Sequence, residues 1–139
     1  MPAGEAILWP MIAQAGVTIG LYVHLGRERV RLVTEGRAKA SDYHTNATET
    51  DESRVLTNTL RNQFELPVLF FACCLAWAAM GFGGWLMPLL AWGFVGAKTV
   101  HSAVQLSARK LMRRRTTFMI ALGIQTVMWL VLAVRLALD

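Results

Sequence analysis

Charged residues are scarce in this sequence of 139 residues: only 17% are Asp, Glu, Lys or Arg, whereas 55% are hydrophobic. The mean hydropathy is positive, at +0.41, which is unusual for a soluble domain. No charged residue occurs between Leu66 and Ala97. Since little chain remains for a separate soluble domain, the composition predicts an all-α membrane protein in a lipid bilayer.

Cysteine and histidine are also rare. The two cysteines, Cys73 and Cys74, are neighbours, and a disulfide between neighbours would be strained, so we expect two small buried hydrophobes. Only three histidines occur, and His101 has no second ligand one helical turn later, so we predict no metal site. The tail Met1–Glu5 lacks the basic residues of a signal peptide, so we expect the first apolar segment to be retained.

Four apolar segments are long enough, or nearly so, to cross a bilayer, which takes about 20 residues. They predict one domain, 1–139, with helices at about 6–25, 52–80, 85–107 and 116–136 and a polar loop at 41–51. Residues 26–40 are expected to extend the first helix along the lipid headgroups. The second helix should bury Leu56, Leu60 and Phe64 as one stripe and kink near Pro67, which leaves the carbonyl of Gln63 without its helical donor.

The basic residues cluster beside the apolar segments. Most Lys and Arg residues lie between positions 26 and 60 or between positions 107 and 116, whereas the N-terminal tail and the turn 81–84 carry no Lys or Arg. The positive-inside rule therefore predicts that loops 26–60 and 107–116 are cytoplasmic and that both termini lie on the opposite side. The net charge of +5 is mostly this topology signal, so we predict no nucleic-acid partner.

Polar residues follow one face of the second and third predicted helices at helical spacing. On the second helix they are Asn58, Arg61, Asn62 and Glu65, and on the third they are Lys98, His101, Gln105 and Arg109. An ionisable side chain at a membrane threshold is costly, so it marks a pairing or functional site. Taken singly, each residue also has a structural interpretation, such as a snorkelling lysine or a hydrogen-bonded helix contact. Together the two rows predict one polar site.

The segment Asn62–Phe70 resembles the second-helix signature of the MAPEG family, the membrane-associated proteins in eicosanoid and glutathione metabolism. In that signature an Asn is followed three residues later by Glu and then by an apolar run, often with Pro. The stretch Val100–Val104 with its basic connection is similar to bacterial members. The resemblance implies a left-handed bundle of four transmembrane helices, a homotrimer and, for a bacterial-type member, the inner membrane.

The resemblance also implies glutathione as cosubstrate, bound between subunits at the cytoplasmic side. By it, Asn62 and Glu65 would hold the peptide, and Arg113 or Arg114 would activate the thiol. Asn58, Arg61, Lys98, His101, Gln105 and Arg109 complete the predicted binding residues. Two positions depart from the pattern. Asn58 or Thr57 stands where glutathione-binding members usually carry arginine, and Lys98 stands where arginine would give a bidentate fork.

Three functions are therefore open on the sequence. The first is a glutathione-dependent transferase or peroxidase that acts on lipophilic electrophiles. The second is a non-catalytic relative that binds a lipid or another acidic amphiphile in the same cleft. The third is a small proton-coupled transporter built around Glu65, although such transporters tend to carry their essential carboxylate in the first helix.

Overall fold

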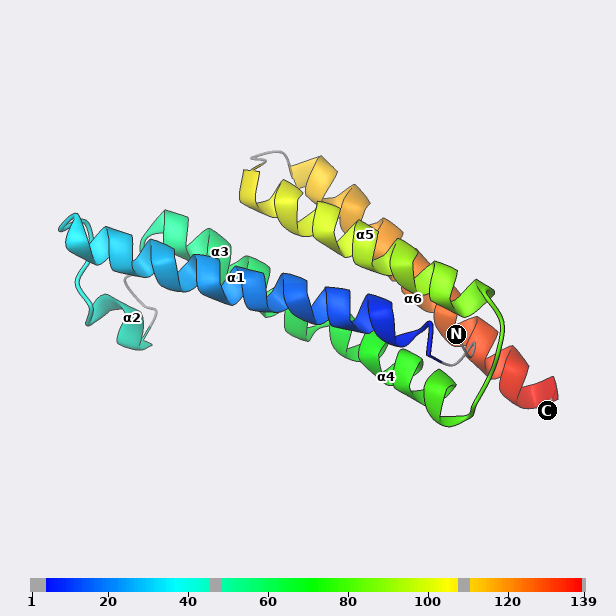
Figure 1. Ribbon diagram of the computed structural model, residues 1–139. Coiled ribbons are helices and arrows are strands. Elements are labelled where there is room, and N and C mark those ends of the chain that lie inside the picture. Colours follow the sequence, from blue (N-terminus) through cyan, green and yellow to red (C-terminus); the bar gives the residue numbers. More distant parts are fainter. Residues whose placement is uncertain (1–4, 46–48, 108–110, 139) are drawn as a thin grey trace.

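The computed structural model describes residues 5–45, 49–107 and 111–138, and every regular element within them is helical. The elements are α1 (Leu8–Thr34), α2 (Asp42–Thr45), α3 (Asp51–Arg61), η1 (Asn62–Phe64), α4 (Leu66–Ala79), α5 (Leu86–Ser107) and α6 (Leu111–Leu138). Helix α1 lies along α3, and α5 packs against α6 (Figure 1).

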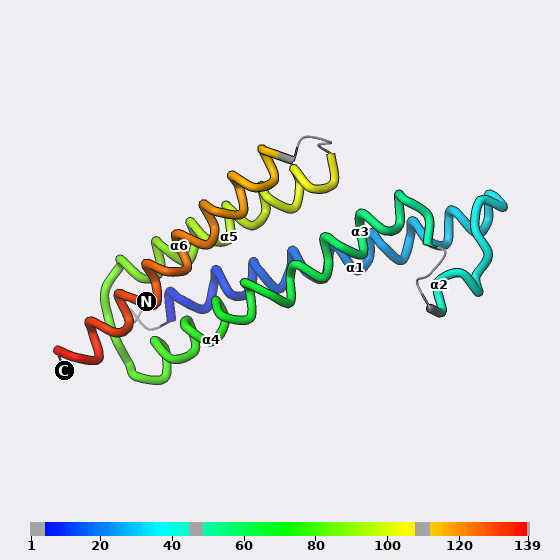
Figure 2. The backbone as a smooth tube through the Cα atoms, turned by 180° about the vertical axis from the view of Figure 1, so that it is seen from behind, coloured from blue at the N-terminus to red at the C-terminus, as the bar shows by residue number. Residues whose placement is uncertain are grey.

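Helices α1 and α3 belong to one layer, and α5 and α6 form the other. The two ends of this arrangement differ. The layers converge where α1 begins and α6 finishes, and they separate toward the end that carries α2, the end of α5 and the start of α6 (Figures 1 and 2). We call these the terminal end and the basic end, because the arginine-rich segments 27–37 and 113–115 lie toward the latter. The predicted all-α class is confirmed.

Three stretches of the described chain are long and apolar enough to cross a membrane. They are Leu8–Thr34, Asp51–Ala79 and Met112–Leu138. Helix α5 has 22 residues but is not among them, because Lys98, His101 and Gln105 interrupt its apolar sequence. These spans support an integral membrane protein.

Helix α1 continues beyond the predicted boundary at Leu25 and finishes at Thr34. Leu25 is buried beside α3, and Leu32 is also buried, so the apolar face of α1 continues past the boundary. Gly36 then adopts a left-handed conformation at φ 71°, and the amides of Gly36 and Arg37 bond back to the carbonyls of Val33 and Leu32. This is a Schellman motif, which ends a helix. Residues 26–34 therefore prolong α1.

The second predicted helix, 52–80, is divided into α3, η1 and α4. The division lies just before Pro67, which cannot donate to the carbonyl of Gln63 and whose ring would clash with that carbonyl in a continuous helix. Glu65 accordingly has a non-helical backbone, with φ −100° and ψ −96°. The change of direction places Phe64 outside the apolar stripe that it was predicted to share with Leu56 and Leu60. Phe64 is 56% exposed and meets Tyr22 edge-on.

Helix α6 begins earlier than the predicted position 116. Its first residue is Leu111, so Arg113, Arg114 and Arg115 belong to a helix and not to the predicted loop 107–116. Arginine has a high helix propensity, and the positive-inside pattern does not distinguish a basic loop from a basic helical turn. The polar loop 41–51 likewise contains the short helix α2.

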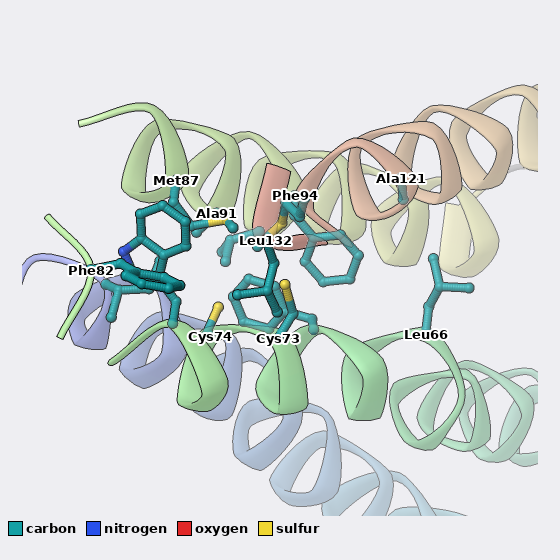
Figure 3. Close-up of a cluster of buried hydrophobic side chains, with 14 residues drawn as sticks. Leu66, Cys73, Cys74, Phe82, Met87, Ala91, Phe94, Ala121 and Leu132 are labelled. Atoms are coloured by element: carbon teal, nitrogen blue, oxygen red, sulfur yellow. The ribbon is translucent and has the colours of Figure 1, made fainter. Parts of the chain in front are cut away.

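The core lies between α4, α5 and α6, toward the terminal end. Phe70 stacks on Phe94 with ring centroids 4.6 Å apart, and Leu132 approaches them from α6 (Figure 3). Cys73 and Cys74 are buried in this cluster as free thiols, which confirms their predicted role as small hydrophobes. The packed core thus joins α4 to α5 and α6 on the terminal side of the helix break.

Candidate functional site

The helix break divides the predicted polar row of the second helix between two environments. Asn58, Arg61 and Glu65 are exposed, and they follow one another at intervals of three and four residues along α3 and the helix break. The carboxylate of Glu65 makes no hydrogen bond or ion pair with another described residue. This exposed row therefore offers one carboxylate, one guanidinium and one amide to a ligand or to a second chain.

Asn62 turns inward and joins α5. Its Nδ2 donates to Oε1 of Gln105 at 2.8 Å, while the ammonium of Lys98 donates to its backbone carbonyl at 3.3 Å. Lys98 has no exposed side-chain surface, and the charge of Glu65 acts on it. The structure thus brings together Asn62, Lys98 and Gln105, which satisfies a carbonyl released by the helix break.

Gln63 is a residue that the sequence analysis missed. Its Oε1 accepts from Nε2 of Gln14 at 2.9 Å, and its Nε2 donates to Oγ of Ser102 at 2.9 Å. The three side chains are buried and link α1, η1 and α5. An amide at this position, four residues before Pro67, was a usable signal, because it follows the buried Leu56 and Leu60 by seven and three residues and so falls on their helical face. This chain of hydrogen bonds makes the break a fixed feature.

His101 faces α6 and not the helix break. Its Nδ1 lies 3.0 Å from Oγ1 of Thr117, whose hydroxyl also lies within bonding distance of the carbonyls of Arg113 and Arg114. If that hydroxyl donates to a carbonyl, Nδ1–H donates to the hydroxyl oxygen. The buried Nε2 then keeps a lone pair, and it has no partner among the described residues. His101 therefore ties the basic start of α6 to α5.

A polar hollow of about 840 Å³ opens toward the basic end. Gln105 and Arg114 are the predicted site residues that line it, and His24, Glu28 and Glu52 are among the residues on the opposite wall. Two of its carboxylates are paired with arginines: Glu28 with Arg31 and Glu52 with Arg37. The hollow is therefore mixed in charge.

Glu49 fastens the connection after α2 to the helices. Its carboxylate accepts hydrogen bonds from Ser53, from Arg29 at 2.8 Å and from Thr57 at 2.7 Å. Burial raises the pKa of Glu49, but the hydrogen bonds from Ser53, Arg29 and Thr57, together with the charge of Arg29, outweigh it and hold the pKa below its ordinary value. The guanidinium of Arg29 also lies 4.9 Å from the ring of Tyr43. We call Arg29, Glu49, Ser53 and Thr57 the loop clasp.

The remaining predicted site residues are distributed as follows. Arg113 and Arg114 are exposed on the first turns of α6. Arg109 lies outside the described residues. No group of three potential metal ligands occurs in the part of the chain that is described. One chain therefore supplies two groups of polar residues. The inward set is Asn62, Lys98 and Gln105, and the outward row is Asn58, Arg61 and Glu65.

Comparison with known proteins gives one match. The family model described as the MAPEG family matches residues 7–134, almost the whole chain. No curated protein and no solved structure matches.

Proposed function

Because the chain belongs to the MAPEG family, as its second-helix motif predicted, we propose that this integral membrane protein is a glutathione-dependent transferase or peroxidase. Its substrates would be lipophilic electrophiles that reach the protein from the bilayer. The observation that supports this proposal is the exposed carboxylate of Glu65, which makes no hydrogen bond or ion pair with another described residue, four residues after the exposed Arg61.

The chemistry of these two side chains suits a small zwitterionic peptide. A carboxylate can bind the amino group of glutathione, and a guanidinium can bind one of its carboxylates in a bidentate manner. Asn62 is held by Gln105 and Lys98, so it would position the adjacent backbone more than it would donate its own amide. The inward set thus supports the outward row.

The outward row is not covered by this chain's own helices. We propose that a second subunit covers it, in a homotrimer of left-handed four-helix bundles in which α5 crosses the membrane with the other three spans. At the basic end, where the two helical layers separate (Figure 2), the hollow of about 840 Å³ could hold a ligand. The site would face the cytoplasm.

Arg113 and Arg114 are our candidates for thiol activation. A neighbouring cation lowers the pKa of a thiol and so raises the fraction of reactive thiolate. That thiolate would attack an electrophilic carbon and displace its leaving group to form a thioether. Alternatively, it would attack a hydroperoxide oxygen, break the O–O bond and release the alcohol, and a second glutathione would convert the resulting glutathione sulfenic acid to the disulfide and water. Arg114 already lines the hollow beside Gln105, and Arg113 is one residue away.

The direct test measures glutathione binding to the purified oligomer of the wild type and to that of Glu65→Gln. A ligand at about 100 times its dissociation constant stabilises a folded protein by about 2.7 kcal/mol. We expect glutathione to raise the thermal unfolding midpoint of the wild type and to produce thiolate absorbance. We expect Glu65→Gln to keep the fold and to lose both responses.

Glu5→Gln is the matched control, because Glu5 is an exposed carboxylate at the terminal end. It should respond to glutathione like the wild type. If saturating glutathione changes neither the unfolding midpoint nor the absorbance of the wild type, the glutathione proposal is wrong. Dissociation of the oligomer by Glu65→Gln would instead make Glu65 a subunit contact.

A second candidate is a non-catalytic relative that binds a lipid or another acidic amphiphile in the same cleft. It is favoured by the exposed Asn58, which stands where an arginine would hold glutathione. Arg54, a nearby cation, is engaged by Asp51 and by the carbonyl of Glu49. A lipid recovered from this cleft, with no response to glutathione, would support this candidate.

A further inference from the structure

Two apolar grooves flank one exposed tryptophan at the terminal end, far from the proposed glutathione site. The first has a volume of about 470 Å³ and runs along α6, where Leu130, Val134 and Arg135 line it. The second has a volume of about 490 Å³ and is lined by Trp9, Leu89 and Trp92 among others. The grooves share Trp85 and Leu86, so they lie on either side of one ridge.

The ridge formed by Trp85 and Leu86 lies where we expect the surface of the membrane. Trp85 is 75% exposed, and it lies in the turn that connects α4 with α5 at the terminal end (Figure 1). Tryptophan concentrates at the level of the lipid headgroups because its ring is apolar and its N–H is polar. The exposed Trp9 and Trp92 in the second groove reinforce this assignment. The grooves therefore extend from the headgroup level into the acyl region.

Arg135 gives this end its only strong positive charge. No other Lys or Arg occurs in 1–26, 66–97 or 116–139, and the positive-inside rule does not account for one here. Its guanidinium lies 5.6 Å from the centre of the Phe82 ring, and it makes no ion pair with another described residue. Within the first groove it is a fixed cation above an apolar surface.

We propose that the two grooves bind one anionic phospholipid with two acyl chains. The phosphate contacts Arg135, one chain follows α6 through the first groove, and the other crosses the Trp85–Leu86 ridge into the second. Trp77, which also lines the first groove, has a buried Nε1–H without an acceptor among the described residues. A lipid oxygen is the acceptor that this groove otherwise lacks.

A lipid accounts for these features better than a second copy of the chain. Glu5 is the only acid among the described residues of this end, so those residues offer a second copy of the chain a single carboxylate to pair with Arg135, whereas the phosphate of every anionic phospholipid carries a charge. A single-chain lipid would fill only one of two grooves that share their wall. The charge and the paired shape together indicate a diacyl anion.

The tryptophans provide a local readout. All five, at 9, 77, 85, 92 and 129, belong to segments near this end, and brominated acyl chains quench tryptophan fluorescence on contact. The full-length protein would be reconstituted in vesicles of brominated phosphatidylcholine, and unbrominated lipids would be added as competitors. We expect phosphatidylglycerol to restore fluorescence at about one fifth of the concentration that phosphatidylcholine needs. One arginine near an anionic headgroup strengthens lipid binding by about this factor.

Variants and a single-chain lipid separate the possible outcomes. Arg135→Gln should abolish the preference for phosphatidylglycerol. Arg27→Gln, an exposed arginine toward the other end, should retain it. Lysophosphatidylglycerol should compete less well than the diacyl lipid.

The proposal is overturned if Arg135→Gln keeps the preference, if Arg27→Gln loses it equally, or if the lysolipid competes as well as the diacyl lipid. It is also overturned if Arg135→Gln changes the oligomeric mass without changing lipid competition, because the grooves would then be a contact between subunits. None of these outcomes depends on a response to glutathione.

Discussion

Glu49 shows how one residue can hold a connection in place by charge and hydrogen bonds. Its side chain is almost fully buried, and Arg29, Ser53 and Thr57 direct their donors at it. Removal of a charged acceptor leaves those donors without a partner. Charged hydrogen bonds of this kind contribute about 1.5–3 kcal/mol each.

The loop clasp predicts a pH-dependent stability. The pKa of Glu49 is depressed in the folded chain, so its contribution is present above the unfolded value and is lost as the pH falls through the folded value. We expect the wild type to lose thermal stability below about pH 4.5, the ordinary value for this carboxyl. Glu49→Gln should be less stable by about 2 kcal/mol at neutral pH and less sensitive to acid, as measured by melting across pH. Equal acid sensitivity in both proteins would contradict the clasp.

Arg113 carries the prediction for the proposed chemistry. If its cation stabilises the thiolate, its removal affects the reacting state more than substrate binding. We expect Arg113→Ala to lower kcat about tenfold, which corresponds to about 1.4 kcal/mol, with little change in KM. Steady-state kinetics with a lipophilic electrophile would measure this, and Arg115→Ala, an exposed neighbour on α6, is the control. A change confined to KM, or an effect from Arg114→Ala alone, would reassign the role.

The break between α3 and α4 is the element that determines the site. Without it, the second helix would place Asn62 and Glu65 on one face, as the three-residue spacing predicted. At the break, Asn62 and Gln63 lie inward and Glu65 lies outward, and hydrogen bonds to Lys98, Gln105 and Ser102 fix this arrangement.

Pro67→Ala tests the origin of the break. Alanine restores an N–H that can donate to the carbonyl of Gln63, so we expect a more continuous helix and an amide at position 67 that is protected from hydrogen exchange. Stability should change by less than about 1 kcal/mol, because the buried hydrogen bonds of Gln63 oppose the straightening. A rapidly exchanging amide at position 67 would mean that the polar network alone maintains the break. Hydrogen exchange measured by NMR in detergent micelles distinguishes the two.

At the scale of the whole molecule, the two ends differ in charge. The arginine-rich segments lie at one end, and the start of α1, the end of α6 and the turn after α4 lie at the other (Figure 1). The positive-inside rule predicts that the basic end faces the cytoplasm, and this orientation stays a prediction. The buried positions of Cys73 and Cys74 make engineered cysteines easy to distinguish from the native thiols.

Cysteine labelling in intact cells tests this orientation. A membrane-impermeant maleimide should label Gly83→Cys directly and should label Ser41→Cys only after permeabilisation, since both positions are exposed and lie at opposite ends. We expect at least a severalfold difference in labelling, because the bilayer excludes the reagent. The wild type should remain unlabelled in both conditions. The reverse pattern for the two variants would invert the proposed topology.

The sequence by itself determined the helical class, three of the four predicted apolar spans, the burial of the two cysteines and the family. These properties depend on composition and on short-range spacing, which do not change when the chain folds. Only the tertiary structure decided that Glu65 lies outside while Asn62, Lys98 and Gln105 meet inside. It also decided that Arg29 and Glu49 meet across 20 residues. The reason is physical: one non-helical residue before Pro67 changes the direction of every side chain near it, and only the packing of α5 and α1 against the break fixes that direction.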